Sequence, residues 1–185
     1  MEPRKCQQTD WIYTHPDRVS TLHDSRVMRC LVVDDDDSPR ELIVRVLRRG
    51  GHKVAGAPDM DAAREFLAGE DVDVVLLDLE MPGTRGPAAI AAVRELCPTA
   101  RILVVSGHDD PRHVVAALEG GADGYLLKDE LSEALSDALQ AVRAGHAPLS
   151  PRVAAVMLRR LRERAPGDPG SGQGRSGKLA RIRDD

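Results

Sequence analysis

Between residues 28 and 144 the chain alternates five times between a short apolar run and an amphipathic stretch of helical periodicity. Two of the apolar runs, 72–77 and 102–105, are nearly continuous, as expected of parallel strands that are covered on both faces. Repeated strand–helix units with short connections predict an α/β fold with a doubly wound, five-stranded parallel sheet. The strands are expected at 30–33, 53–57, 72–77, 102–105 and 125–127, and the helices at 39–49, 60–68, 87–96, 111–120 and 130–144.

Turn and cap residues separate these elements. The Ser-Pro-Arg-Glu stretch at 38–41 has the spacing of a capping box with proline at the first helical position, so the first helix is expected to begin there. Glycines follow most of the predicted helices, where a helix is expected to end. A further helix is expected at 151–164, with an apolar side that includes Val153 and Leu161 and with arginines around the rest.

Composition divides the chain into four segments. Residues 1–27 are polar and lack periodicity, so either they form a disordered leader or translation begins at Met28. Residues 28–148 are expected to form the globular domain, and 149–165 a C-terminal helix. Residues 166–185 are rich in proline, glycine and serine and are expected to be a disordered tail.

The overall composition excludes several classes of protein. A hydrophobic content of 42% supports a packed core, and a net charge of −4 argues against a protein that coats nucleic acid along its whole surface. Cys6, Cys30 and Cys97 form no CxxC pair, which disfavours a disulfide framework or a zinc site and suits a reducing compartment. With no apolar run long enough to span a bilayer, the sequence predicts a soluble cytoplasmic protein with no membrane partner.

Polar residues suited to phosphate chemistry follow the predicted strands. Asp34 and Asp35 follow the first strand, Asp78 the third, Ser106 the fourth and Lys128 the fifth. Open α/β sheets bind ligands beyond the carboxyl ends of their strands. Three carboxylates brought together there repel one another unless a cation joins them, and hard oxygen ligands suit Mg²⁺. A nearby lysine and hydroxyl can hold phosphoryl oxygens, so the set favours phosphoryl transfer.

Each of these residues also has an ordinary structural explanation. The acidic run at 34–37 would by itself most often be a solvated loop or a helix cap. Asp78 could be a turn former, Ser106 part of a plain turn, and Lys128 a surface lysine. The prediction of a site therefore depends on their joint occurrence, in order, at the ends of strands.

Four motifs resemble the receiver domain of two-component response regulators, which has a CheY-like (flavodoxin-like) fold. They are Leu-Val-Val-Asp-Asp at 31–35, Asp-Leu-Glu-Met-Pro-Gly at 78–83, Val-Val-Ser-Gly at 104–107, and the segment 121–128, which ends in Lys128. The step from Lys128 to Asp129, where many receivers have proline, is similar to the NarL/LuxR-type subfamily. The resemblance covers about residues 28–145.

The resemblance implies a phosphoacceptor and a metal site. Asp78 would be the nucleophile that takes a phosphoryl group from the phosphohistidine of a sensor histidine kinase. Mg²⁺ would be bound by Asp35 directly, by Asp34 mostly through water, by the Asp78 carboxylate and by the backbone carbonyl of Glu80. Asp34 and Asp35 are favoured over the two aspartates that follow, because they come directly after the strand.

The resemblance also implies a switch. Ser106 would hydrogen-bond the phosphoryl group and Lys128 would pair with it. Tyr125 would change rotamer as Ser106 moves, which would reshape the output face. The alternative for Tyr125 is an ordinary half-buried strand tyrosine.

Three functional readings follow. The favoured one is a stand-alone receiver that is not an enzyme and that switches protein–protein contacts, with a second copy of the chain or with a downstream protein. The second is the receiver part of a NarL/LuxR-type transcription regulator that lacks its helix-turn-helix here; the arginine-rich helix at 151–164 is a weak footprint for DNA, so binding of DNA through this chain is not expected. The third is an enzyme of the haloacid-dehalogenase kind, which is disfavoured because Glu80 stands where that class requires a second aspartate.

Overall fold

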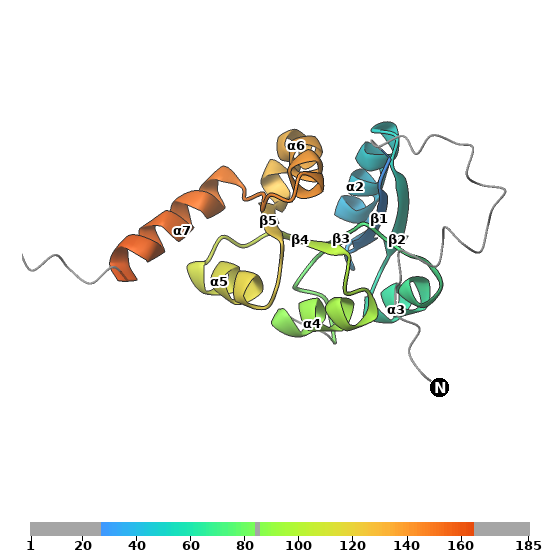
Figure 1. The fold of residues 1–185 in the computed structure, drawn as a ribbon, viewed down its shortest axis with the longest axis horizontal. Helices are drawn as coiled ribbons and strands as arrows, with labels where there is room; N and C mark the ends of the chain where they lie inside the picture. Colours follow the sequence, from blue (N-terminus) through green and yellow to red (C-terminus); the bar gives the residue numbers. More distant parts are fainter. Residues whose placement is uncertain (1–26, 84–85, 165–185) are drawn as a thin grey trace, which may run out of the picture.

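The protein is described by a computed structural model that covers residues 27–83 and 86–164 (Figure 1). The leader and tail expected at 1–27 and 166–185 lie outside the described residues, apart from Val27. No helix in the described part is long and apolar enough to cross a membrane.

Five parallel strands form a single sheet with the order β2-β1-β3-β4-β5, so the predicted fold class is confirmed. The chain leaves β1 toward one side of the sheet and returns to place β3 on the other side of β1. This reversal of direction creates a crevice at the carboxyl ends of β1 and β3, where open α/β sheets bind their ligands. The strands are β1 (Arg29–Val33), β2 (Lys53–Ala57), β3 (Val74–Leu77), β4 (Arg101–Ser106) and β5 (Gly124–Leu127).

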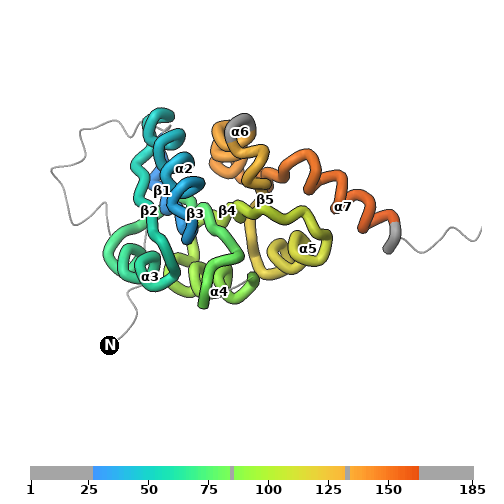
Figure 2. The backbone as a smooth tube through the Cα atoms, turned by 180° about the vertical axis from the view of Figure 1, so that it is seen from behind, coloured from blue at the N-terminus to red at the C-terminus, as the bar shows by residue number. Residues whose placement is uncertain are grey.

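Helices cover both faces of the sheet (Figures 1 and 2). One face carries α2 (Asp37–Arg49) and α6 (Leu131–Arg143), whose buried side chains share one apolar cluster with the sheet. The other face carries α3 (Met60–Gly69), α4 (Pro87–Leu96) and α5 (Pro111–Glu119), which share a second cluster. A short 3₁₀ helix, η2 (Lys128–Glu130), joins β5 to α6.

The last described helix, α7 (Pro151–Arg164), packs against α5 and β5 and then extends beyond the body of the domain (Figures 1 and 2). Val153 in its first turn is fully buried in the same apolar cluster as α5. Leu158 and Leu161, farther along, are 55% and 60% exposed. The start of α7 is therefore anchored on the domain, and its second half is not covered by it.

The expected start of α2 is wrong. Asp36 is the N-cap, because its side chain accepts a hydrogen bond from the backbone N–H of Ser38 at 3.0 Å. The helix begins at Asp37, and Pro39 lies within its first turn, where a missing N–H costs nothing. The other predicted boundaries either match the observed ones or differ by at most two residues, the usual uncertainty of element ends.

Candidate functional site

Strand pairing brings the two central acids together. Val33 pairs with Leu77 in the register of β1 and β3, and the backbone N–H of Asp78 donates to the carbonyl of Val33 at 2.9 Å. The next residue of each strand, Asp34 or Asp78, therefore lies at the same point of the sheet edge. Both carboxylates are buried there, with residue exposures of 1% and 5%.

Asp35 completes a cluster of three carboxylates. Ligand oxygens of Asp34, Asp35 and Asp78 all lie within 4.8 Å of one another, and Asp35 is the exposed member. Burial raises the pKa of Asp34 above its ordinary value, and the neighbouring charge of Asp78 adds to this effect, although Lys128 and the backbone N–H of Asp36 oppose it. The cluster thus carries more negative charge than its surroundings readily hold.

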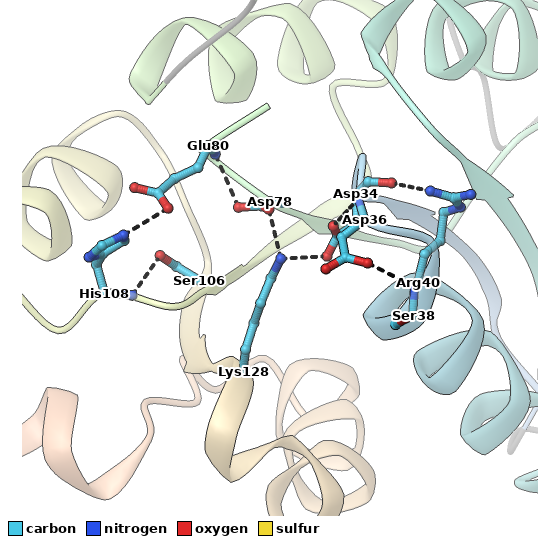
Figure 3. A network of polar contacts seen from close by, with 9 residues as sticks. All are labelled: Asp34, Asp36, Ser38, Arg40, Asp78, Glu80, Ser106, His108 and Lys128. Atoms are coloured by element: carbon cyan, nitrogen blue, oxygen red, sulfur yellow. Dashed lines mark hydrogen bonds and ion pairs between the residues drawn. The ribbon is translucent and has the colours of Figure 1, made fainter. Parts of the chain in front are cut away.

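Lys128 is the cation nearest to these acids (Figure 3). Its Nζ donates to Asp78 Oδ2 at 2.8 Å and lies equally close to Asp34 Oδ2, which is buried and accepts no well-formed hydrogen bond. Burial alone would lower the lysine pKa, but the two carboxylates raise it above its ordinary value. One ammonium is therefore shared between two buried carboxylates, and a further cation would be favoured here.

The acidic run at 34–37 divides between two tasks. Asp34 Oδ1 accepts from the backbone N–H of Asp36 at 3.0 Å, which turns the chain from β1 into α2. Asp37 forms an ion pair with Arg40, and Arg40 also donates to the backbone carbonyl of Asp34 at 2.6 Å. Asp36 and Asp37 thus serve the start of α2, while Asp34 and Asp35 belong to the carboxylate cluster.

Ser106 and Tyr125 lie on the other side of the crevice. Ser106 Oγ is buried and accepts from the backbone N–H of His108 at 3.1 Å. The Tyr125 ring is fully buried, and its hydroxyl donates to the backbone carbonyl of His108 at 2.8 Å. Both side chains line a cavity of about 500 Å³ between α4 and α5. Among the described residues no hydrogen bond joins Ser106 to Asp78.

Sequence reasoning missed a pair at the mouth of the crevice. His108 Nε2 lies 2.8 Å from Glu80 Oε2, and both side chains are about half exposed (Figure 3). Glu80 was expected to contribute only its carbonyl; its backbone N–H donates to Asp78 Oδ1 at 3.0 Å. A signal for the pair does exist in the sequence, since each partner follows a strand-end site residue, Asp78 or Ser106, by two positions on the same edge.

The chain is similar in sequence to known proteins. The family model described as response regulator receiver domain matches residues 30–140. A probable transcriptional regulatory protein NarL of Mycobacterium tuberculosis is 36% identical over 140 residues, which are 75% of this chain and 65% of that protein. The nitrate/nitrite response regulator protein NarL of Escherichia coli K12 is 38% identical over 137 residues, 69% of this chain and 61% of that protein. The chain thus spans somewhat less than two thirds of the length of these curated relatives.

The fold is similar to those of solved structures. A crystal structure of a LuxR-family two-component response regulator from Aurantimonas superposes with a TM-score of 0.66 at 32% identity, covering 73% of this chain and 99% of that one. The isolated receiver domain of RcsB from Salmonella enterica, solved with the phosphomimetic BeF₃⁻, gives a TM-score of 0.65 at 25% identity, covering 70% of this chain and 97% of that one.

Proposed function

This chain belongs to the response regulator receiver family, of the NarL/LuxR type, and we propose that it accepts a phosphoryl group on Asp78 from a sensor histidine kinase. The observation that carries the proposal is the cluster of Asp34, Asp35 and Asp78, with ligand oxygens within 4.8 Å, and the ammonium of Lys128 beside it. This cluster lies at the crevice where the chain reverses direction.

The same residues fit a magnesium ion. Hard carboxylate oxygens are the ligands that Mg²⁺ prefers, and Asp34 Oδ2 is a buried oxygen that shares the Lys128 ammonium with Asp78. Asp34, Asp35 and Asp78, with the backbone carbonyl of Glu80, would hold the ion. When bound, Mg²⁺ supplies positive charge that offsets the carboxylates and the transferred phosphoryl oxygens.

The chain's own residues position and neutralise the transferred group. A carboxylate oxygen of Asp78 bonds to phosphorus as the phosphorus–nitrogen bond of the kinase phosphohistidine breaks, and the imidazole nitrogen keeps the electron pair. Lys128 already contacts Asp78 Oδ2 and pairs with a phosphoryl oxygen after transfer. Ser106 Oγ accepts from the backbone N–H of His108, and the hydroxyl can donate its own proton to a phosphoryl oxygen after transfer.

We also propose the switch and the setting. Tyr125 follows the movement of Ser106, and the changed face binds a second copy of the chain or a downstream protein. We place the protein in the cytoplasm, a reducing compartment that suits the buried thiol of Cys30. The protein accepts phosphate and is not a turnover enzyme; steady hydrolysis of phosphate esters would contradict this.

A second candidate function is that of a receiver within a DNA-binding transcription regulator. It is favoured by the relative from Mycobacterium tuberculosis, a probable transcriptional regulatory protein, and by the share of the two relatives' length, 65% and 61%, that this chain spans. Under this candidate the same phosphoacceptor site would control DNA binding by a further part of the protein.

The test of the proposed function is labelling with radioactive acetyl phosphate or with a phosphorylated histidine kinase in the presence of Mg²⁺. Asp78→Asn should abolish the label, because the amide keeps the shape of the side chain and loses the nucleophile. Asp37→Asn, in the first turn of α2, is the matched control and should label normally. Equal labelling of the Asp78→Asn variant, or a label stable to acid and base, would refute the assignment.

A further inference from the structure

We propose that Arg152, at the start of α7, is a positioning residue for phosphoryl transfer, because it joins the two segments that follow Ser106 and Lys128 and thereby couples α7 to the site. Arg152 lies beyond residues 30–140, the part that matches the receiver family model. The proposal rests on the proposed role of Asp78 and adds a residue from outside the matched domain to its machinery.

The guanidinium of Arg152 faces three acids. Nη2 lies 2.7 Å from Asp109 Oδ2, Nη1 lies 2.5 Å from Asp129 Oδ2, and Nε lies 4.0 Å from Glu130 Oε1. Asp109 lies in the loop that connects β4 to α5, three residues after Ser106. Asp129 directly follows Lys128 in η2. One planar fork therefore spans the two loops that leave the site on this side of the sheet.

The backbone before Arg152 is fixed along the free edge of β5. The N–H of Tyr125 donates to the carbonyl of Pro148 at 2.9 Å, and the N–H of Ser150 donates to the carbonyl of Tyr125 at 3.0 Å. The buried Ser150 hydroxyl also accepts from the N–H of Leu127 at 3.0 Å. Leu149 thus forms an isolated parallel bridge with Tyr125 at the edge of the sheet, three residues before Arg152.

Gly124 makes this attachment possible. A Cβ at Gly124 would lie 2.6 Å from the carbonyl oxygen of Pro148, far closer than a carbon atom can approach, so only glycine lets the segment come this near to β5. On the other side of Arg152, Val153 is fully buried. The guanidinium is therefore carried by a firmly seated helix start.

The acids depend on Arg152 for their charge balance. In the described part of the chain neither Asp109 nor Asp129 forms an ion pair with any other cation, and Glu130 Oε2 is buried without a hydrogen-bond partner. The Arg152 hydrogen bond is the main cause that holds the pKa of Asp109 below its ordinary value. Without Arg152 the acids would add repulsion to a site that already carries three carboxylates.

Coupling follows from the geometry. A phosphoryl group on Asp78 attracts the Lys128 ammonium and the Ser106 hydroxyl, so the neighbouring Asp129 and Asp109 shift with their loops. The planar guanidinium of Arg152 is bonded to both acids. It therefore fits one distance between the two loops better, either that of the unphosphorylated state or that of the phosphorylated state. By thermodynamic linkage, the two effects are equal in free energy. The amount by which the Arg152 contacts favour the phosphorylated state is the amount by which phosphorylation changes the attachment of α7 to the domain.

The experiment uses the full chain and two readouts. The first is the rate of labelling by acetyl phosphate at saturating Mg²⁺ for wild type, Arg152→Ala, Arg152→Lys and Arg159→Ala. Arg159 is an exposed arginine of the same helix, so its variant controls for loss of charge. We expect about a fivefold lower rate for Arg152→Ala, the scale of a surface ion-pair network, partial recovery with Arg152→Lys, and no change for Arg159→Ala.

The second readout is hydrogen exchange of residues 148–157 with and without beryllofluoride. Wild type should show a change of protection on adding beryllofluoride, and Arg152→Ala should show faster exchange in both states with a smaller difference between them. An unchanged labelling rate, an equal loss in Arg159→Ala, or unaltered exchange would overturn the proposal. Failure of the proposed function is distinguishable, because Asp78→Asn would then label like wild type whatever Arg152 does.

Discussion

Two clusters of acids and bases lie at opposite ends of the same sheet. At the amino ends of the strands, Asp123 accepts hydrogen bonds from the backbone N–H of Ile102 at 2.9 Å, from Arg101 at 2.8 Å and from Arg94 at 3.0 Å. One acid is there surrounded by two cations and a backbone donor. At the carboxyl ends, three carboxylates lie together, and the ammonium of Lys128 contacts two of them, Asp34 and Asp78.

The two clusters shift the pKa of their acids in opposite directions. Burial would raise the pKa of Asp123, but the Ile102 N–H and the two guanidinium groups together lower it below the ordinary value. Burial raises the pKa of Asp34, and Lys128 does not compensate for it. The structural acid Asp123 is thus surrounded by enough donors and positive charge to stabilise its ionised form. The site acid Asp34 is not, so it can still bind a cation.

The largest effect is expected from Asp123→Ala. This change leaves Arg94 and Arg101 without their shared acceptor and removes the partner of the Ile102 N–H, so the free energy of unfolding should fall by about 2–3 kcal/mol. Urea unfolding followed by circular dichroism at pH 7 measures it. Glu95→Ala, on the exposed side of α4, is the control and should change stability by less than about 0.5 kcal/mol. Similar losses in both variants would show that Asp123 is an ordinary surface acid.

A smaller effect of opposite sign is expected from Asp34→Asn without metal. The amide oxygen can still accept from the Asp36 N–H, and Lys128 is left with one buried carboxylate to neutralise. The free energy of unfolding in EDTA should therefore rise by about 1 kcal/mol, a gain typical of substitutions that relieve strain in a functional site. Mg²⁺ should stabilise the wild type and not this variant. If Asp34→Asn is less stable in EDTA, the cluster is a structural ion pair and the comparison fails.

The sequence predicted the fold and the carboxyl-edge cluster for the same reason. The periodicity of apolar residues and the length of each strand are visible in the local sequence. In a parallel sheet the residues that follow the strands lie at the same edge, so Asp34, Asp78 and Lys128 could be grouped from the sequence alone. For the acidic run before α2, the sequence predicted that Asp34 and Asp35 join the cluster but not that Asp36 caps the helix. Either Asp36 or Ser38 can cap it, and the choice depends on how the chain leaves β1.

Contacts made by long side chains could not be predicted in this way. Arg94 reaches Asp123 across 29 residues and Arg152 reaches Asp109 across 43, and neither pair is marked by a spacing or a motif. Such contacts depend on where α4 and α7 end up in space. The amino-edge cluster and the Arg152 contacts therefore became visible only in the structure, although all of their residues are ordinary in the sequence.

The smallest effect concerns pH. It distinguishes the two clusters by the pH range in which the stability difference of each variant disappears. The pKa of Asp123 is lower in the folded state than its ordinary value of 3.8. Ionised Asp123 therefore stabilises the fold above pH 3.8, and this stability is lost as pH falls through 3.8 and below it. The difference between wild type and Asp123→Ala should stay constant from about pH 8 to pH 5 and shrink only below about pH 4. Asp34 has a raised pKa, so its ionisation costs stability as pH rises above 3.8. When pH is lowered, the stability advantage of Asp34→Asn should therefore begin to shrink at a higher pH than the Asp123 difference does. Urea unfolding of the three proteins in EDTA between about pH 3.5 and pH 8 measures both differences. If the two differences disappear over the same pH range, the opposite shifts of the two acids, and with them the contrast between the two ends of the sheet, are wrong.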